Sequence, residues 1–326
     1  MVYYSNSNIP HITYLTTIKS ENKNKNKNVN LICKNTYKNN IANGIWIWNT
    51  KNVISNEKYI INNLKKENIK TVYIQINKNL DQLIPFLREA QETHIKVWAL
   101  DGNPDDINNY LSLIDDINRI KIFNINHKNA AFEGFQIDVE PYLKQDWNLN
   151  EYYYVNKYVE MLISLKNLIS NTMKFSIVIP FWFDNIKVNN SNLAFFAINI
   201  ANEVVIMSYR TDLKELLDIS SNDLAYAQLM DKPIKLGIET SYLPDERHFI
   251  IKTPVVDKFC QGVGNYCFLD KTPFDGLPFV NTYEVKSDKL TFFKKRNQLQ
   301  QFINQLITLN NFKGYVINNY ESFFQK

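Results

Sequence analysis

The chain has 326 residues, enough to bury a sizeable core, and a length that an α/β barrel commonly occupies as one domain. Its 37 Lys and Arg against 33 Asp and Glu leave a net charge of +4, too mild to indicate a nucleic-acid or strongly acidic partner. Three cysteines exclude a disulfide-framework protein, and the sequence has no apolar run of about 18 residues that would predict a membrane span.

Residues 1–40 are predicted to form an N-terminal extension. Within it, residues 20–30 read SENKNKNKNVN, a polar low-complexity stretch that cannot bury apolar surface, so we expect an exposed or disordered segment. No charged leader followed by an apolar core is visible at the N-terminus. We therefore expect a cytoplasmic protein, unless the chain is the processed form of a secreted one.

Residues 41–326 alternate short apolar runs, rich in β-branched and aromatic residues, with amphipathic stretches of helical length. The predicted strands are Gly44 to Trp48, Thr71 to Ile76, Lys96 to Leu100, Gly134 to Val139, Phe175 to Pro180, Glu203 to Ser208, Ile234 to Ile238 and Gly314 to Ile317. The helices expected between them include Asn56 to Glu67, Asp81 to Glu92, Asp105 to Ile120, Glu151 to Asn167 and Lys294 to Thr308. Eight strands separated by helices predict a (β/α)8 TIM barrel.

The alternative fold is an open doubly wound sheet, which needs a glycine-rich phosphate turn after its first strand. Here WNTKNVIS follows that strand, so the barrel is favoured. The interval 242–312 is longer than one crossover needs, and we expect an insertion or elaborated crossover between strands seven and eight. Cys260 and Cys267 fall in this interval, either as a small bridge or as two thiols.

A barrel of this kind builds its active site at the carboxyl ends of its strands, where this chain is unusually polar. Aromatic residues there can stack on sugar rings, and carboxylates can bind hydroxyls or cap the following helix. The candidate substrate-binding residues are Trp48, Gln75, Asp101, Gln136, Trp182, Asp184, Arg210, Asn318 and Tyr320.

The fourth strand carries a pair of carboxylates. Because strand side chains alternate, Gln136, Asp138 and Glu140 share the face toward the barrel axis. Inward carboxylates are costly to bury unless they hydrogen-bond one another or serve a site, and crowding raises the pKa of one of them, as a general acid near neutral pH requires. The alternative is a structural salt-bridge cluster, for instance with Arg210.

Residues 133–140, EGFQIDVE, resemble the fourth strand of the family 18 glycoside hydrolases, the chitinase type, which reads DGxDxDxE. Gly134, Asp138 and Glu140 match, whereas Glu133 and Gln136 replace two Asp residues. The resemblance implies that Glu140 protonates the glycosidic oxygen. It also implies that Asp138 orients the substrate acetamide that attacks the anomeric carbon.

A second motif supports this resemblance. The sixth strand of that family ends in MxYD, and residues 207–210 here read MSYR, so the resemblance implies that Tyr209 holds the acetamide oxygen. Arg210 replaces the Asp, and residues 318–320, NNY, stand where the family has a Trp. These replacements motivate an alternative, a catalytically inactive, lectin-like barrel that binds glycans.

A second carboxylate arrangement competes with substrate assistance. Many retaining glycosidases of this fold place an acid/base Glu after strand four and a nucleophilic Glu after strand seven, where this chain has Glu140 and Glu239. Carboxyls about 5 Å apart indicate double displacement, and a wider gap favours inversion or substrate assistance. Alternatively, Glu239 is a rim residue paired with Lys235 or Arg247.

Together these features predict a glycoside hydrolase that cleaves a β-linked glycan, N-acetylated or not. Its catalytic residues would be Glu140 as general acid/base, Asp138 or Glu239 as the assisting or nucleophilic carboxylate, and Tyr209. We expect a monomer with a carbohydrate substrate, no nucleic-acid partner and no cofactor. The four histidines are scattered without ligand spacing, which argues against a zinc site. A lyase or metal-assisted hydrolase is a third possibility.

Overall fold

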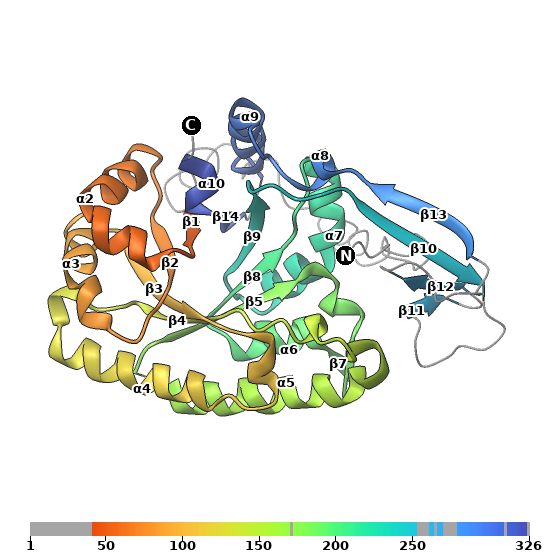
Figure 1. The fold of residues 1–326 in the computed structure, drawn as a ribbon, viewed down its shortest axis with the longest axis horizontal. Helices are drawn as coiled ribbons and strands as arrows, with labels where there is room; N and C mark the ends of the chain where they lie inside the picture. The colour runs from red at the N-terminus through yellow and green to blue at the C-terminus, as the bar shows by residue number, and fades with distance from the viewer. Residues whose placement is uncertain are drawn as a thin grey trace, which may run out of the picture. The chain divides into compact units, whose positions relative to one another are not determined.

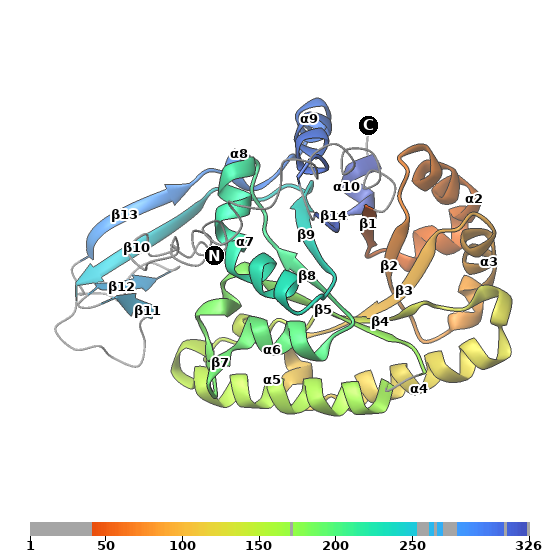
Figure 2. The same cartoon turned by 180° about the vertical axis from the view of Figure 1, so that it is seen from behind.

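The computed structural model describes residues 41–169, 172–252, 261–263, 266–269, 279–309 and 312–324, so the predicted extension of residues 1–40 lies outside the described residues. Eight parallel strands close into a barrel with helices around it (Figure 1). The view from behind shows the same ring of helices, with α4 and α5 running along one side of the strands (Figure 2). The predicted (β/α)8 TIM barrel is confirmed.

All eight predicted strands are present, with ends shifted by up to two residues. The barrel order is β1-β14-β9-β8-β5-β4-β3-β2. The strands are β1 (Ala42–Ile47), β2 (Thr71–Gln75), β3 (Lys96–Asp101), β4 (Gly134–Ile137), β5 (Lys174–Pro180), β8 (Glu203–Met207), β9 (Ile234–Glu239) and β14 (Gly314–Asn318). Because β4 ends at Ile137, Asp138 and Glu140 lie just beyond the strand, although the Asp138 amide still donates to Asp101 O (3.1 Å).

The five predicted helices are also present, with different ends. The helices are α2 (Thr50–Lys66), α3 (Ile84–Glu92), α4 (Leu111–Asn126), α5 (Trp147–Ile169), α6 (Leu193–Ile200), α7 (Leu213–Leu229), α8 (Ser287–Leu290), α9 (Arg296–Leu306) and α10 (Tyr320–Phe324). The first helix was expected at Asn56 but begins at Thr50, because the Asn49 side chain caps it by accepting from the Asn52 amide. Asn56 instead marks a kink inside the helix.

The predicted insertion between the seventh and eighth barrel strands is confirmed. Between β9 and β14 the chain forms a four-stranded antiparallel sheet in the order β11-β12-β10-β13. Its strands are β10 (Glu246–Lys252), β11 (Gln261–Val263), β12 (Tyr266–Leu269) and β13 (Phe279–Val285). Cys260 lies outside the described residues, so the bridge between Cys260 and Cys267 stays a prediction.

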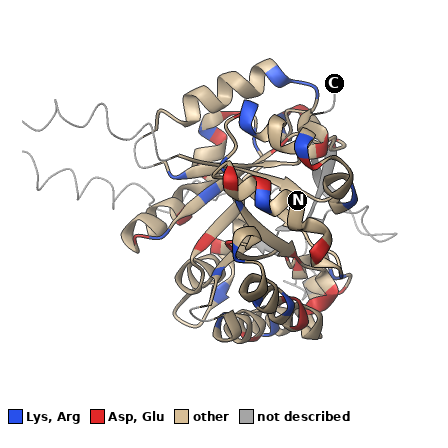
Figure 3. Cartoon of the chain, turned by 90° about the vertical axis from the view of Figure 1, so that its left-hand side faces the viewer, with Lys and Arg blue, Asp and Glu red and all other residues tan. Residues whose placement is uncertain are grey.

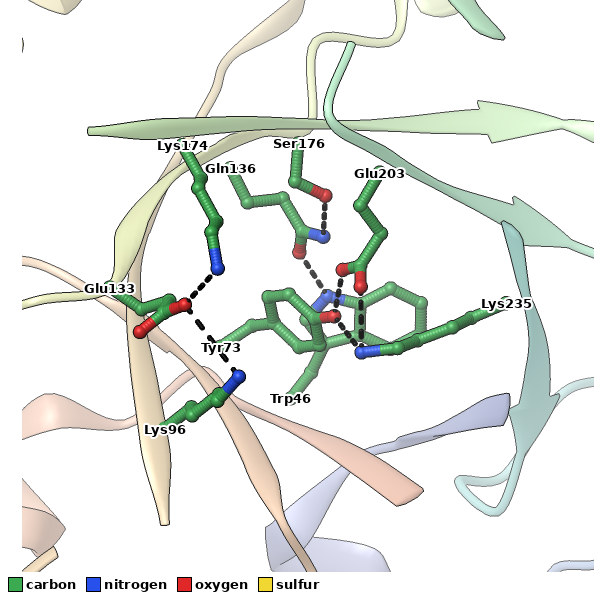
Figure 4. Close-up of polar contacts among 9 residues, drawn as sticks. All are labelled: Trp46, Tyr73, Lys96, Glu133, Gln136, Lys174, Ser176, Glu203 and Lys235. Carbon is green, nitrogen blue, oxygen red and sulfur yellow. Dashed lines mark hydrogen bonds and ion pairs between the residues drawn. The ribbon is translucent and has the colours of Figure 1, made fainter. Parts of the chain in front are cut away.

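The interior of the barrel is mostly apolar and aromatic, with one amide at its centre. Trp46, Tyr73 and Trp98 pack there with aliphatic side chains from β3, β5, β8 and β14. Gln136 is fully buried among them: its Oε1 accepts from Trp46 Nε1 (2.7 Å), and its Nε2 donates to Ser176 Oγ (2.8 Å) (Figure 4). Gln136 therefore faces the axis as predicted, with its amide satisfied inside the barrel.

A buried ion pair occupies the amino-terminal end of the same interior. Lys235 Nζ lies 2.9 Å from Glu203 Oε2 and donates to the Tyr73 hydroxyl (2.8 Å), which itself donates to Glu203 (Figure 4). Burial lowers the pKa of Lys235, and Glu203 opposes that effect. Lys235 thus pairs with Glu203, and the expected alternative pairing of Lys235 with Glu239 is wrong, because the two side chains lie at opposite ends of β9.

The distribution of charged residues and the hydrophobicity of the helices agree with the sequence analysis. In the view of Figure 3, Lys and Arg are interspersed with Asp and Glu over the helices, in keeping with the net charge of +4. Among the helices of the described ranges, none combines the length and apolar character needed to cross a membrane.

Candidate active site

Four neighbouring strands bring polar side chains together at the carboxyl end of the barrel. Trp48 and Asn318 each lie two residues past an interior side chain of the same strand, Trp46 and Val316, so both face the axis at the mouth. The Asn318 side chain bridges Trp48 and Glu239: its Oδ1 accepts from Trp48 Nε1 (2.9 Å), and its Nδ2 donates to Glu239 Oε2 (2.7 Å). The same Nδ2 lies 3.5 Å from the Tyr209 hydroxyl.

Tyr209 joins this network to the carboxylates of the fourth strand. Its hydroxyl is buried, which raises its pKa well above the usual value, and the charges of Glu239, Asp138 and Glu140 raise it further. The charges of the three carboxylates predicted to be catalytic therefore all act on one phenol. We call Trp48, Asp138, Glu140, Tyr209, Glu239 and Asn318 the mouth cluster.

Glu239 is held by donors on both of its oxygens. Its side chain is 3% exposed. Oε1 accepts from the amides of Thr240 (2.8 Å) and Ser241 (2.6 Å) and from the Ser241 hydroxyl, while Oε2 accepts from Asn318. Burial raises the pKa of Glu239, and these hydrogen bonds oppose the increase by stabilising the charged form.

The carboxyl of Asp138, unlike that of Glu239, has a buried oxygen that accepts no hydrogen bond from the described residues. This oxygen, Oδ1, is shielded from solvent. Burial raises the pKa of Asp138 well above its usual value, and the neighbouring charge of Glu140 adds to this. An unpartnered buried carboxylate oxygen is costly when charged, so Asp138 favours the protonated state until a donor reaches it.

Glu140 follows β4 and precedes a short helical turn, η4 (Pro141–Leu143). Burial raises its pKa, as a general acid near neutral pH requires, and a hydrogen bond that the Tyr142 hydroxyl donates to Glu140 Oε2 lowers it. Sequence reasoning missed Tyr142. Its position two residues after Glu140 was a signal, but only the η4 turn shows that the two side chains meet.

Two further candidates, one aromatic and one cationic, contact Tyr142 and Tyr209. Trp182 is buried in the turn η5 (Phe181–Asn185) and packs edge-on against the Tyr142 ring, with ring centroids 5.1 Å apart. Arg210 is also buried: its Nη1 donates to the Tyr209 carbonyl (2.7 Å), and its guanidinium lies over the Phe181 ring. Trp182 thus packs against the residue that hydrogen-bonds to Glu140, and Arg210 contacts the backbone of Tyr209 in the mouth cluster.

Four candidates are held elsewhere. Asp101 hydrogen-bonds to Asp116 of α4, and burial together with Asp116 raises its pKa to about 7. Asp184 accepts from Asn222 of α7 (2.8 Å), and the Tyr320 hydroxyl accepts from Asn63 of α2 (2.9 Å). Gln136 lies below the mouth, inside the barrel. Each of these four side chains hydrogen-bonds to a helix or to the barrel core, so its polar group has a structural partner without a bound ligand.

An open cavity of about 660 Å³ adjoins the mouth cluster on the β1 side. Its lining includes Trp48, Lys51, Asn77, Asn319 and Glu321. Gln75, the remaining candidate, ends β2 near this side, and its carbonyl accepts from the Thr50 hydroxyl. In the described part of the chain, no group of three or more His, Cys, Asp or Glu is arranged to hold a metal ion.

We expect the Asn318 bridge to be sensitive to charge. In Asn318→Asp the introduced carboxyl would face Glu239, so unfolding free energy should fall by about 1–3 kcal/mol, and by more at pH 8 than at pH 5, where a proton can restore the bond. Urea denaturation at both pH values measures this. The matched control is Asn222→Asp, which alters an exposed amide–carboxylate bond. Equal losses in both variants would contradict the expectation.

Known proteins resemble this chain in structure but not in sequence. The sequence matches no known family profile and no curated protein. A family 18 chitinase from Pseudoalteromonas aurantia is similar in structure, with a TM-score of 0.50 and 11% identity over 86% of this chain and 94% of that one. At this identity the likeness shows the fold alone, a (β/α)8 barrel shared with that chitinase.

Two further solved structures are similar at lower scores. A family 18 chitinase from Cycas revoluta, in complex with (GlcNAc)3, has 13% identity and a TM-score of 0.45 over 86% of this chain and 95% of that one. A β-galactosidase from Halorubrum lacusprofundi has 8% identity and a TM-score of 0.49 over 86% of this chain and 53% of that one.

Proposed function

We propose that the chain is a glycoside hydrolase that cleaves a β-linked, N-acetylated glycan, with Glu140 as general acid/base. The observation that carries the proposal is the mouth cluster, in which Asp138 and Glu140 follow β4, with Asp138 Oδ1 shielded from solvent and Glu140 bound by the Tyr142 hydroxyl. Burial raises the pKa of both carboxyls. A carboxyl that keeps its proton toward neutral pH is what protonation of a glycosidic oxygen requires. The chitinase-like barrel supports the hydrolase class.

The contacts of Glu239 favour substrate assistance over double displacement. Its two oxygens accept four hydrogen bonds, which lower the nucleophilicity of a carboxylate and fix it in place. Asp138 by contrast has a buried oxygen to which no residue in the described ranges donates. The N–H of a 2-acetamido group would supply that donor, so Asp138 suits the role of orienting the acetamide.

In the proposed reaction, Glu140 protonates the glycosidic oxygen while the acetamide oxygen of the substrate attacks the anomeric carbon. The bond to the leaving group breaks, and a cyclic oxazolinium forms. Asp138 accepts the acetamide N–H, and the Tyr209 hydroxyl donates to the acetamide oxygen. Glu140, now charged, then takes a proton from water, which adds to the anomeric carbon and opens the ring.

A catalytically inactive glycan-binding barrel is the second candidate. Arg210 favours it, because this buried cation stands where the resemblance places a carboxylate, and its guanidinium donates to the Tyr209 carbonyl close to the mouth. The aromatic Trp48 and the open cavity beside it would serve either function.

Two aryl glycosides separate these candidates. We expect wild type to release nitrophenol from 4-nitrophenyl β-N,N′-diacetylchitobioside but not from 4-nitrophenyl β-cellobioside, which lacks the acetamide. Asp138→Asn should lower kcat on the first substrate by about 10²–10³-fold. Equal turnover of both substrates would instead support a carboxylate nucleophile. Calorimetric binding of chitooligosaccharide without any turnover would support the lectin.

A further inference from the structure

We infer that Tyr142 is a positioning residue for Glu140: its hydroxyl fixes one carboxyl oxygen so that the other can meet the substrate. The catalytic consequence rests on the proposed function. The hydroxyl donates to Glu140 Oε2, whereas Glu140 Oε1 accepts no hydrogen bond from the described residues. A carboxyl bound through one oxygen keeps a single orientation, and the free oxygen is the one available to carry a proton to a leaving group.

The surroundings of Tyr142 give its hydroxyl a fixed direction. The ring packs edge-on against Trp182 at 69° and against Phe183 at 89°, with centroids 5.1 and 6.2 Å apart. Pro141 is buried and begins the η4 turn, which the Leu143 amide closes by donating to Glu140 O (3.1 Å). Backbone and ring contacts together hold the phenol against the carboxyl.

The same hydrogen bond affects ionisation. A donor stabilises the charged carboxylate, so Tyr142 lowers the pKa of Glu140 against the larger opposing effect of burial. Burial also raises the pKa of Tyr142 well above its usual value, which keeps the phenol a donor. The other titratable groups that face this pair are Asp138, Tyr209 and Tyr158 of α5.

Tyr142→Phe tests the inference, with Tyr154→Phe as the matched control. Tyr154 of α5 is buried but also donates to a carboxylate, Asp146 Oδ1 (2.7 Å), beyond the η4 turn and outside the mouth cluster. In Tyr142→Phe we expect kcat on the chitobioside to fall about 10-fold and the high-pH limb of kcat/KM to move up by about one pH unit. The limb moves up because Glu140 keeps its proton to higher pH. The control should show neither change.

A second measurement makes the result independent of turnover. We expect ¹³C NMR titration of the Glu side-chain carboxyls, with Glu140→Gln used for assignment, to place the pKa of Glu140 higher in Tyr142→Phe than in wild type. If wild type turns over no glycoside but this pKa moves, the proposed function fails while the hold of Tyr142 on Glu140 stands. An unchanged pKa of Glu140 in the variant overturns the inference, as does an unchanged pH profile in an active enzyme.

Discussion

Glu140→Gln is expected to lower kcat on the chitobioside by about 10²–10⁴-fold, with a small change in KM. The amide keeps the shape of the side chain and can still accept the hydrogen bond from Tyr142 through its oxygen. It has no acidic proton for the leaving group and no basic oxygen to take one from water. Steady-state kinetics at the pH optimum of wild type measure the loss.

The control for this change is a second carboxylate of the same strand region. Glu133 lies at the amino-terminal end of β4, where it pairs with Lys174 and Lys96 on the surface (Figure 4). Glu133→Gln should leave kcat within about twofold of wild type, because the group is a strand length away from the mouth. Unchanged turnover in Glu140→Gln would remove Glu140 from the role of general acid.

The second large effect is expected inside the barrel. Lys235→Met should lower the free energy of unfolding by about 3–5 kcal/mol, because it leaves the Glu203 carboxylate buried without its cation. The side chains of Lys235 and Glu203 are 4% and 11% exposed, so solvent screens the pair little. The Tyr73 hydroxyl loses its donor in the same change. Urea denaturation followed by circular dichroism measures the loss.

Two further variants show whether the cost comes from the unpaired charge. Adding Glu203→Gln to Lys235→Met removes that charge and should recover more than half of the lost stability. Lys96→Met breaks an exposed pair with Glu133, whose N–O distance is 3.7 Å, and should cost less than about 1 kcal/mol. A loss in Lys235→Met as small as in Lys96→Met would show that the buried pair contributes little.

Much of the fold could be predicted from local pattern. The eight strands have short β-branched runs, and their period-two alternation correctly places Gln136 inside the barrel. Helix ends were less predictable, because they depend on single caps such as Asn49 and on the kink at Asn56. The candidate site was predictable to the extent that these residues follow barrel strands: Asn318 contacts both Tyr209 and Glu239, and the charges of Asp138, Glu140 and Glu239 all raise the pKa of Tyr209. The catalytic roles of these residues stay predictions.

The partners of individual side chains were not predictable. Asp101 was a candidate for binding hydroxyls, but its carboxyl meets Asp116 of α4. Lys235 was a possible partner of Glu239, yet it pairs with Glu203 at the other end of the barrel. These contacts depend on which strands and helices become neighbours. Several carboxylates in the sequence could pair equally well with a given Lys or Asp side chain, so the sequence alone does not select the partner.

The sequence by itself determined that Asp138 and Glu140 stand at the carboxyl end of the fourth strand, because strand length and side-chain alternation are local properties of the backbone. Only the tertiary structure decided what surrounds them. Closure of the barrel puts β14 between β1 and β9, and this lets Asn318 join Trp48, 270 residues away in sequence, to Glu239. Such contacts follow from how the strands are ordered around the axis, which no local pattern encodes.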